Sequence, residues 1–214
     1  MFKYDNKVNR IMTVVFDFLI LNAIFLIMSI PIITIGANVT ALYSVGFQMV
    51  RKDESSVYKT YFRSFKENFK QATAAWCFLL SIILILFWNM TILDQTTGIS
   101  PIVNIMTVLF LVLTLIFLLY IFPIISKFEN SLYVQAKNVL LLSIGYFPYT
   151  ILFTLINLGP IFIAYRWYPA QYLLVVYGYF FIGFALTIIL NARIFNRIFN
   201  NMLKTNEHMG PELE

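Results

Sequence analysis

The chain of 214 residues is 60% apolar and 12% charged, with a formal net charge of +5 and a mean hydropathy of +0.81. Soluble domains are about 45–50% apolar and about 25% charged, so this composition excludes a water-soluble globular domain and an intrinsically disordered chain. The single cysteine excludes an intramolecular disulfide, and the single histidine excludes a multi-histidine metal site. We therefore expect an all-α, multi-pass integral membrane protein.

Stretches without charge indicate where the helices cross the membrane. Asp, Glu, Lys and Arg are absent from four long stretches, 71–93, 95–126, 138–165 and 167–192. About 20 apolar residues cross a bilayer core that is about 30 Å thick, so each stretch can cross once. A fifth stretch, 11–50, contains only one charge. The predicted spans are 11–31, 34–50, 72–93, 102–125, 139–165 and 170–193.

The first span contains Asp17, the only acidic residue within a predicted span. A carboxylate inside the membrane is costly, so a specific role is the default hypothesis. Coupling to a proton or cation is one reading, and pairing with a nearby basic group or contact with lipid headgroups is another. The spans provide no His, Lys or second acid for a proton relay, which favours the structural reading.

Residues 31–44, PIITIGANVTALYS, combine a helix break with small and polar side chains. Pro31 lacks an amide donor and disfavours a continuing helix. Gly36, Thr40 and Ser44 recur every four residues, a spacing that lets helices approach closely in lipid. The polar groups at the break could instead face a ligand. The candidate residues for a polar site or a packing motif are Asp17, Asn22, Thr34, Gly36, Asn38, Thr40 and Tyr43.

The second span, 34–50, is short enough to be a full span, a half-span or an interfacial helix. If it crosses, the protein has six spans, both termini are cytoplasmic, and only Arg166 of the 15 basic residues lies outside. If it does not cross, the N-terminus faces outward and the basic residues divide 11 to 4. Because cytoplasmic segments collect Lys and Arg, we expect a bundle of about six transmembrane helices in one domain, 1–203.

An amphipathic inner helix is expected at 56–70, before the third span. Its aromatic stripe consists of Tyr58, Phe62, Phe65 and Phe69, and its basic stripe of Lys59, Arg63, Lys66 and Lys70. Aromatic rings beside a line of cations suit a helix at the inner membrane surface, in contact with anionic lipids. Docking of a membrane-protein partner is the alternative. We expect no nucleic-acid binding, because the rings lie on one narrow face instead of forming a stacking platform.

The remaining sequence shows no pattern typical of catalysis. There is no phosphate-binding glycine loop and no Cys/His cluster, and His208 lies in a polar tail, 204–214, expected in the cytoplasm. Cys77 lies in an apolar span, where a thiol is unreactive. We therefore expect no enzyme activity, no catalytic residues, no cofactor and no metal.

Three segments resemble a known family. Asp17 with Leu21 and Asn22, then PIITIGANVTALY at 31–43, then FRSFKENFKQA at 62–72, are similar to the YesL family, small membrane proteins of unknown function, mostly from Gram-positive bacteria. The resemblance implies a location in the bacterial plasma membrane. Because its members are often encoded beside ABC-type carbohydrate importers, it also implies an accessory role in carbohydrate uptake, with an importer permease as partner. The family supplies no established binding residues.

Three functions therefore remain open. The first is a non-catalytic accessory or assembly subunit for carbohydrate uptake. The second is a stand-alone transporter or channel for small solutes or ions. The third is a membrane scaffold or a sensor of the cell envelope.

Overall fold

The computed structural model describes residues 7–53, 55–95, 101–168 and 172–208. These residues form helices and short connections, and they contain no β-strand. The elements are α1 (Lys7–Met28), the 3₁₀ turn η1 (Ile32–Thr34), α2 (Ile35–Arg51), α3 (Val57–Gln95), α4 (Pro101–Lys127), α5 (Leu132–Gly145), α6 (Phe147–Arg166), α7 (Tyr172–Gly178), the π-helical segment η2 (Tyr179–Gly183) and α8 (Phe184–His208).

Five segments of the described chain are long and apolar enough to cross a bilayer: Ile32–Arg51, Val57–Thr91, Ile102–Lys127, Phe147–Arg166 and Tyr172–Met202. The apolar part of α1, Met12–Met28, is shorter. This all-helical architecture is compatible with a multi-pass membrane protein.

Several of the expected helix boundaries differ from the observed ones. The expected inner helix 56–70 and the expected span 72–93 form one continuous helix, α3, because neither Pro nor Gly occurs between its ends. The expected span 139–165 is instead divided at Tyr146, whose φ of −115° and ψ of 40° end α5. Pro148 then lies in the first turn of α6, where its missing N–H costs no hydrogen bond.

The last helix is longer than expected. α8 continues past residue 193, the expected end of the last span, to His208. The beginning of the expected polar tail 204–214 is therefore helical, and residues 209–214 lie outside the described part of the chain.

α2 is the centre of the packing. It contacts α1, α3, α4 and α8, and it is the most buried of the candidate spans. Aromatic side chains join it to α8, with the rings of Tyr43 and Phe195 6.0 Å apart and those of Phe47 and Phe199 5.8 Å apart. All four rings are buried, so this interface is a main part of the core.

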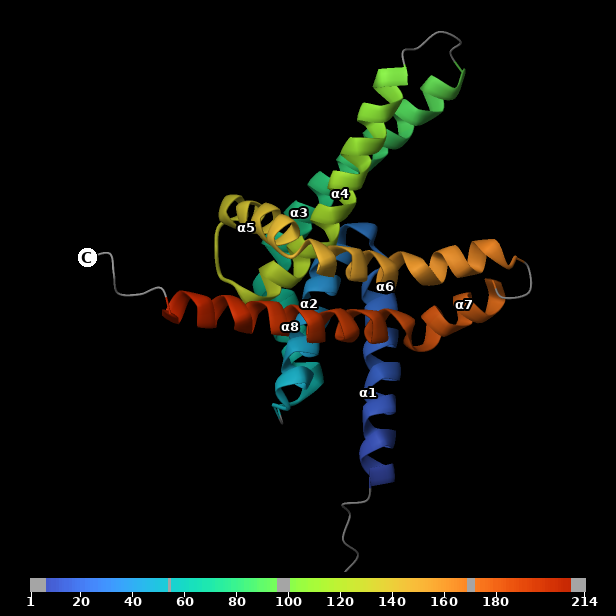
Figure 1. Ribbon diagram of the computed structural model, residues 1–214. Helices are drawn as coiled ribbons and strands as arrows, with labels where there is room; N and C mark the ends of the chain where they lie inside the picture. The colour runs from blue at the N-terminus through green and yellow to red at the C-terminus, as the bar shows by residue number, and fades with distance from the viewer. Residues whose placement is uncertain (1–6, 54, 96–100, 169–171, 209–214) are drawn as a thin grey trace, which may run out of the picture.

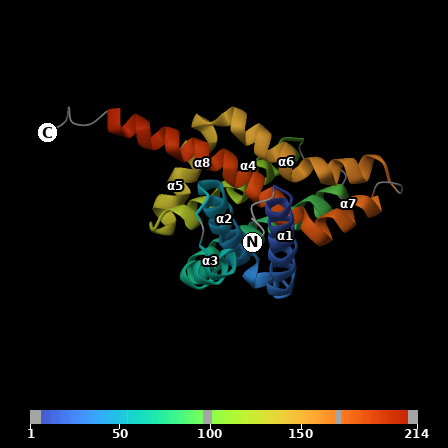
Figure 2. The same cartoon turned by 90° about the horizontal axis from the view of Figure 1, so that it is seen from below.

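Two helical hairpins extend from this centre in different directions (Figure 1). One consists of α3 and α4, and the other pairs α6 with α7 and α8. α6 and α8 run across α1 and α2, which are seen nearly end-on from below (Figure 2). α2 therefore packs along α3 and is crossed by α8 (Figure 1).

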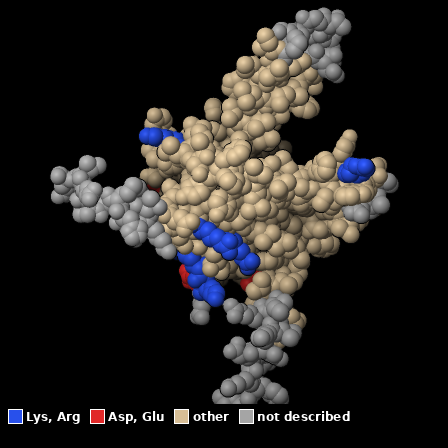
Figure 3. Space-filling view, viewed as in Figure 1, with Lys and Arg blue, Asp and Glu red and all other residues tan. Residues whose placement is uncertain are grey.

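The outer surfaces of both hairpins are apolar. Phe78 is 67% exposed on α3, Trp88 is 70% exposed on the same helix, and Leu174 is 73% exposed on α7. Charged side chains occupy only a few places on the face shown in Figure 3. Surfaces of this kind are stable in lipid and costly in water.

Candidate functional site

Asp17, the acidic residue of the first expected span, is paired with a residue of α3. The hydroxyl of Tyr58 donates a hydrogen bond to Asp17 Oδ1 at 2.8 Å, and both residues are half-buried. Tyr58 was expected on an aromatic stripe facing the membrane. It connects the first turn of α3 to α1 instead, so the described partner of Asp17 is a hydroxyl.

Asn22 is fully buried and bonds to the π-helical segment before α8. Its Nδ2 donates to the carbonyl oxygens of Tyr179 at 3.0 Å and Phe180 at 2.7 Å, and its Oδ1 accepts from the N–H of Ala185 at 3.1 Å. A π-helical turn displaces backbone groups from their α-helical partners. Asn22 bonds to three backbone groups of this region, two carbonyl oxygens and one N–H. Both of its amide hydrogens and its side-chain oxygen are therefore used.

Gly36 lies at a close approach of α2 to α3. A Cβ atom at this position would be 2.5 Å from the carbonyl oxygen of Ala72 and 2.6 Å from Cβ of Trp76, so no larger residue fits without movement. The indole N–H of Trp76 also donates to the carbonyl oxygen of Ile32 at 2.7 Å. The geometry at Gly36 is that of close helix packing.

Thr34 compensates for the helix break at Pro31. Its hydroxyl lies 2.5 Å from the carbonyl oxygen of Met28 and 2.7 Å from that of Pro31, and it donates to these groups. Both carbonyls lie where α1 has ended and regular partners are missing. Thr34 is therefore a capping residue of the α1–α2 connection.

Asn38 is fully buried between three elements. Its Oδ1 accepts from the hydroxyl of Tyr61 on α3 at 3.0 Å, and its Nδ2 donates to Ser29 Oγ after α1 at 3.0 Å. Burying an amide is favourable only when such partners are present. The contacts join α2 to α3 and to the connection after α1.

Thr40 and Tyr43 complete the set predicted from the break. The hydroxyl of Thr40 donates to the carbonyl oxygen of Gly36 at 2.9 Å, and the Tyr43 hydroxyl accepts from Asn191 Nδ2 at 3.4 Å. The structure thus places the seven predicted residues in separate interhelical and intrahelical contacts, and it does not bring them together around one polar cavity.

Polar side chains line a cleft of about 580 Å³ at the end of α2, the start of α3 and the end of α4, away from the seven predicted residues. We call it the polar cleft. Its cations are Arg51, Arg63 and Lys127, and its carboxylates are Asp53, Glu67 and Glu129. Hydroxyl and amide side chains make up most of the remaining lining, among them Ser44, Gln48, Ser64, Asn68 and Gln71.

Internal hydrogen bonds hold the walls of the polar cleft together. Ser44 Oγ and Ser64 Oγ are 2.6 Å apart, which joins α2 to α3. Asn68 Nδ2 donates to Ser64 Oγ at 3.1 Å on the same helix. Gln71 Nε2 donates to the carbonyl oxygen of Asn130 at 2.6 Å, which joins α3 to the connection after α4. The site is therefore built from three preordered segments.

Gln48 has unused hydrogen-bonding capacity beside this cleft. The side chain is 2% exposed, and its Nε2 donates to the carbonyl oxygen of Ser55 at 2.5 Å. Its Oε1 is buried without a partner among the described residues. An unpaired buried acceptor costs about 1–3 kcal/mol, and a donor from a bound molecule would remove this cost.

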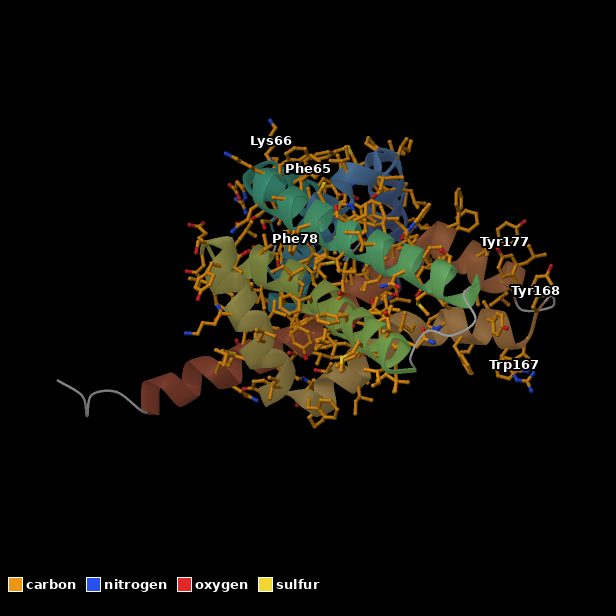
Figure 4. All side chains as sticks on the ribbon, turned by 90° about the horizontal axis from the view of Figure 1, so that it is seen from above. Phe65, Lys66, Phe78, Trp167, Tyr168 and Tyr177 are labelled. Carbon is orange, nitrogen blue, oxygen red and sulfur yellow. The ribbon has the colours of Figure 1, made fainter. Side chains whose placement is uncertain are left out.

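The basic stripe predicted for docking is divided by the structure. Arg63 lines the polar cleft, whereas Lys59, Lys66 and Lys70 are exposed outside it. Lys66 points outward beside Phe65 (Figure 4). Among the predicted aromatic residues, Phe62 is 46% exposed, Phe69 is 39% exposed and Phe65 is half-buried.

The sequence interpretation missed most of the polar cleft, although its signal is present. Ser44, Gln48 and Arg51 recur at i, i+4 and i+7 along α2. A second stripe along α3 comprises Thr60, Ser64, Glu67 and Gln71. Residues with this spacing share one face of a helix, so two polar faces near one end of adjacent helices predict a polar cleft.

The described residues contain no group of three or more His, Cys, Asp and Glu side chains that could hold a metal ion. The polar cleft has instead the donors, acceptors and charges of both signs that bind a polar molecule or a peptide segment.

Comparison with known proteins gives one match. A family model described as "Protein of unknown function, DUF624" matches residues 18–90. Neither the curated proteins nor the solved structures include a match. The matched region contains the second half of α1, all of α2 and most of α3, and therefore the α1–α2 break and two walls of the polar cleft. Over this region the chain is similar to an uncharacterised family.

Proposed function

We propose that this protein is a non-catalytic accessory or assembly subunit of the bacterial plasma membrane, and that it docks a carbohydrate importer of the ABC type through the polar cleft. The observation that carries the proposal is the contrast between two sets of polar groups. The side chains of Asp17, Asn22 and Asn38 bond to other side chains or to the backbone, whereas three cations and three carboxylates of the polar cleft line an open volume.

The first set argues against a solute pathway through the described helices. Asn22 and Asn38 are fully buried and have partners on both ends of their amides. Asp17 is paired with Tyr58. A transport site near the middle of the membrane would need such groups to face the solute, as the polar groups of transporters do.

Charge supports a cytoplasmic position for the polar cleft. In the six-span topology with both termini inside, Arg51, Arg63 and Lys127 belong to the inner basic residues, and Arg166 lies on the opposite side. The segment that docks in the cleft is then a cytoplasmic part of an importer permease.

The lining also indicates the chemistry of that segment. Three cations and three carboxylates surround the volume, so a peptide with side chains of both signs is complementary to it. A donor of the partner, such as a backbone N–H, would complement Oε1 of Gln48, which has no partner among the described residues. The sugar context comes from the resemblance to the YesL family.

The proposal is tested in a strain that lacks the gene. Uptake of labelled mono- and oligosaccharides is measured after complementation with wild type, with the cleft variant Arg63→Glu/Lys127→Glu, or with the control Lys66→Glu/Lys137→Glu. The control makes the same charge change at exposed positions outside the cleft. We expect wild type and the control to restore uptake and the cleft variant to fail at equal membrane abundance.

Two results would contradict the proposal. The first is uptake of every sugar at the wild-type rate in the deletion strain. The second is sugar flux in proteoliposomes that contain the purified protein alone, which would show a stand-alone transporter.

A further inference from the structure

A second cleft, of about 560 Å³, lies between α1, the end of α2 and α8. One side of it is basic, with Lys52, Arg193 and Arg197, and another side is apolar, with Val14, Phe18 and Ile189. We call it the basic cleft. It shares no lining residue with the polar cleft.

The helices arrange these side chains in a gradient from apolar to charged. Ile189, Arg193 and Arg197 follow at i, i+4 and i+8 on one face of α8, and their burial decreases from a side chain 3% exposed at Ile189 to two exposed arginines. Val14 and Phe18 form a similar pair, at i and i+4, on α1. The apolar wall thus leads directly to the cations.

Lys52 is the third cation of the basic side, and its backbone has an unfavourable left-handed conformation. It adopts a left-handed conformation, with φ of 58°, and caps α2 through hydrogen bonds from its N–H to the carbonyl oxygens of Gln48 and Met49. This sharp turn ends α2 beside α8 and leaves the Lys52 side chain exposed at the cleft. Non-glycine residues rarely adopt this conformation, so the turn is well supported by its surroundings.

The charges in the basic cleft are not balanced locally. None of the described residues that line it is acidic. Figure 3 shows Lys and Arg side chains gathered below α8 where it crosses α2, with acidic atoms only at the edges of the patch. The nearby carboxylate of Asp17 bonds to Tyr58 on α3. The cleft therefore has an excess of positive charge next to an apolar surface.

We propose that the basic cleft binds an anionic phospholipid, with its phosphate between Lys52, Arg193 and Arg197 and an acyl chain along Val14 and Phe18. Basic pockets between transmembrane helices favour anionic headgroups, and arginine forms two-point hydrogen bonds to phosphate. A small soluble anion would contact only the cations, whereas the acyl chain of a phospholipid would also cover the apolar wall. This inference does not depend on docking of an importer.

The test is native mass spectrometry of the full chain in detergent with added lipid. The probes are dioleoyl-phosphatidylglycerol, dioleoyl-phosphatidylcholine with the same acyl chains, and inorganic phosphate. The variants are Arg193→Gln and Arg197→Gln, and Arg166→Gln is the control. Arg166 is exposed and directly precedes Trp167, which marks the far end of the α6–α7 hairpin (Figure 4).

We expect one phosphatidylglycerol to bind in preference to phosphatidylcholine. Each cleft variant should lower its affinity about fivefold, since one cation near an anionic surface contributes about a factor of this size. Arg193→Lys keeps the charge and should retain most of the binding, which separates the effect from misfolding. The Arg166→Gln control should bind like wild type.

Three results would overturn the inference. They are equal binding of the two lipids, unchanged phosphatidylglycerol binding by the double variant Arg193→Gln/Arg197→Gln, and binding of inorganic phosphate as tight as that of phosphatidylglycerol. The last result would show a site for a free anion.

Discussion

The side-chain oxygen of Asn22 accepts a hydrogen bond from the backbone N–H of Ala185 at 3.1 Å, across a sequence separation of 163 residues. With the two bonds that Asn22 donates to Tyr179 and Phe180, this contact fixes α1 against the π-helical segment that precedes α8. Asn22 therefore holds the first helix to the last hairpin at a backbone irregularity, together with the ring contact between Phe25 and Phe184 at 5.1 Å.

Replacement of this side chain should destabilise the protein. Asn22→Leu keeps a similar volume but leaves three backbone groups without their partner, and we expect a loss of about 1–3 kcal/mol in the free energy of unfolding. The measurement is thermal unfolding in detergent. Asn157→Leu is the control, because the Asn157 amide donates to the carbonyl oxygen of Phe153 on its own helix. Equal losses in the two variants would contradict the role of Asn22.

The close approach of α2 to α3 predicts an effect at Gly36. Gly36→Ala would place a Cβ atom 2.5 Å from the carbonyl oxygen of Ala72, and overpacking of this kind costs about 1–3 kcal/mol. Gly159→Ala is the matched control, because a Cβ there meets nothing within 4 Å. Since alanine favours a helix more than glycine does, the control should be neutral or more stable. A Gly36→Ala protein as stable as this control would contradict the packing role.

The bond between Asp17 and Tyr58 predicts an energetic coupling between α1 and α3. In a double-mutant cycle of Asp17→Ala and Tyr58→Phe, we expect a coupling of about 1 kcal/mol, because each single change already removes the bond. The control cycle pairs Tyr58→Phe with Thr13→Ala, since the Thr13 hydroxyl bonds to the Asn9 carbonyl on its own helix. Additive effects in both cycles would show that the contact contributes nothing.

The six-span topology can be tested by labelling single cysteines in a Cys77→Ala background. The positions are Asn9→Cys, Lys59→Cys and Arg166→Cys, all exposed in the structure. A membrane-impermeant maleimide should label only Arg166→Cys in intact cells and the other two after permeabilisation. Labelling of Asn9→Cys in intact cells would instead place the N-terminus outside and show that 34–50 does not cross.

Much of the helical architecture could be predicted from local features of the sequence. Uncharged stretches of about 20 residues mark the long apolar helices because the cost of a charge in lipid is large and independent of the fold. The break after Pro31 also follows from one residue, since proline cannot donate the hydrogen bond that a continuing helix needs. These predictions require no knowledge of which helices are neighbours.

The relative directions of the helices could not be predicted in this way. The crossing of α8 over α2 depends on the fit of Tyr43 and Phe47 against Phe195 and Phe199, which are far apart in the sequence. Similarly, the polar groups of Asn22 and Asn38 indicate only that each needs partners. Whether a partner is a ligand or another helix depends on long-range packing, which the pattern of one chain does not contain.

The polar cleft could be predicted only in part, because its two walls follow local spacing but their meeting depends on long-range packing. The stripe of Ser44, Gln48 and Arg51 is readable from helical spacing, but its importance depends on a second stripe on α3 facing the same volume. The single contact between Ser44 and Ser64 at 2.6 Å shows that the two stripes meet. The sequence contains the spacing of each wall, and the structure shows the cleft between them.

The central claim, that the polar cleft docks an importer, is tested most directly by photocrosslinking in cells. p-Benzoylphenylalanine replaces Arg63 or Glu129 in the cleft, or Lys66 or Tyr165, which are exposed elsewhere, and the products are identified by mass spectrometry. We predict crosslinks to a permease subunit of an ABC-type carbohydrate importer from the two cleft positions and not from the other two. Crosslinks to such a subunit from all four positions alike, or from neither cleft position, would contradict the account.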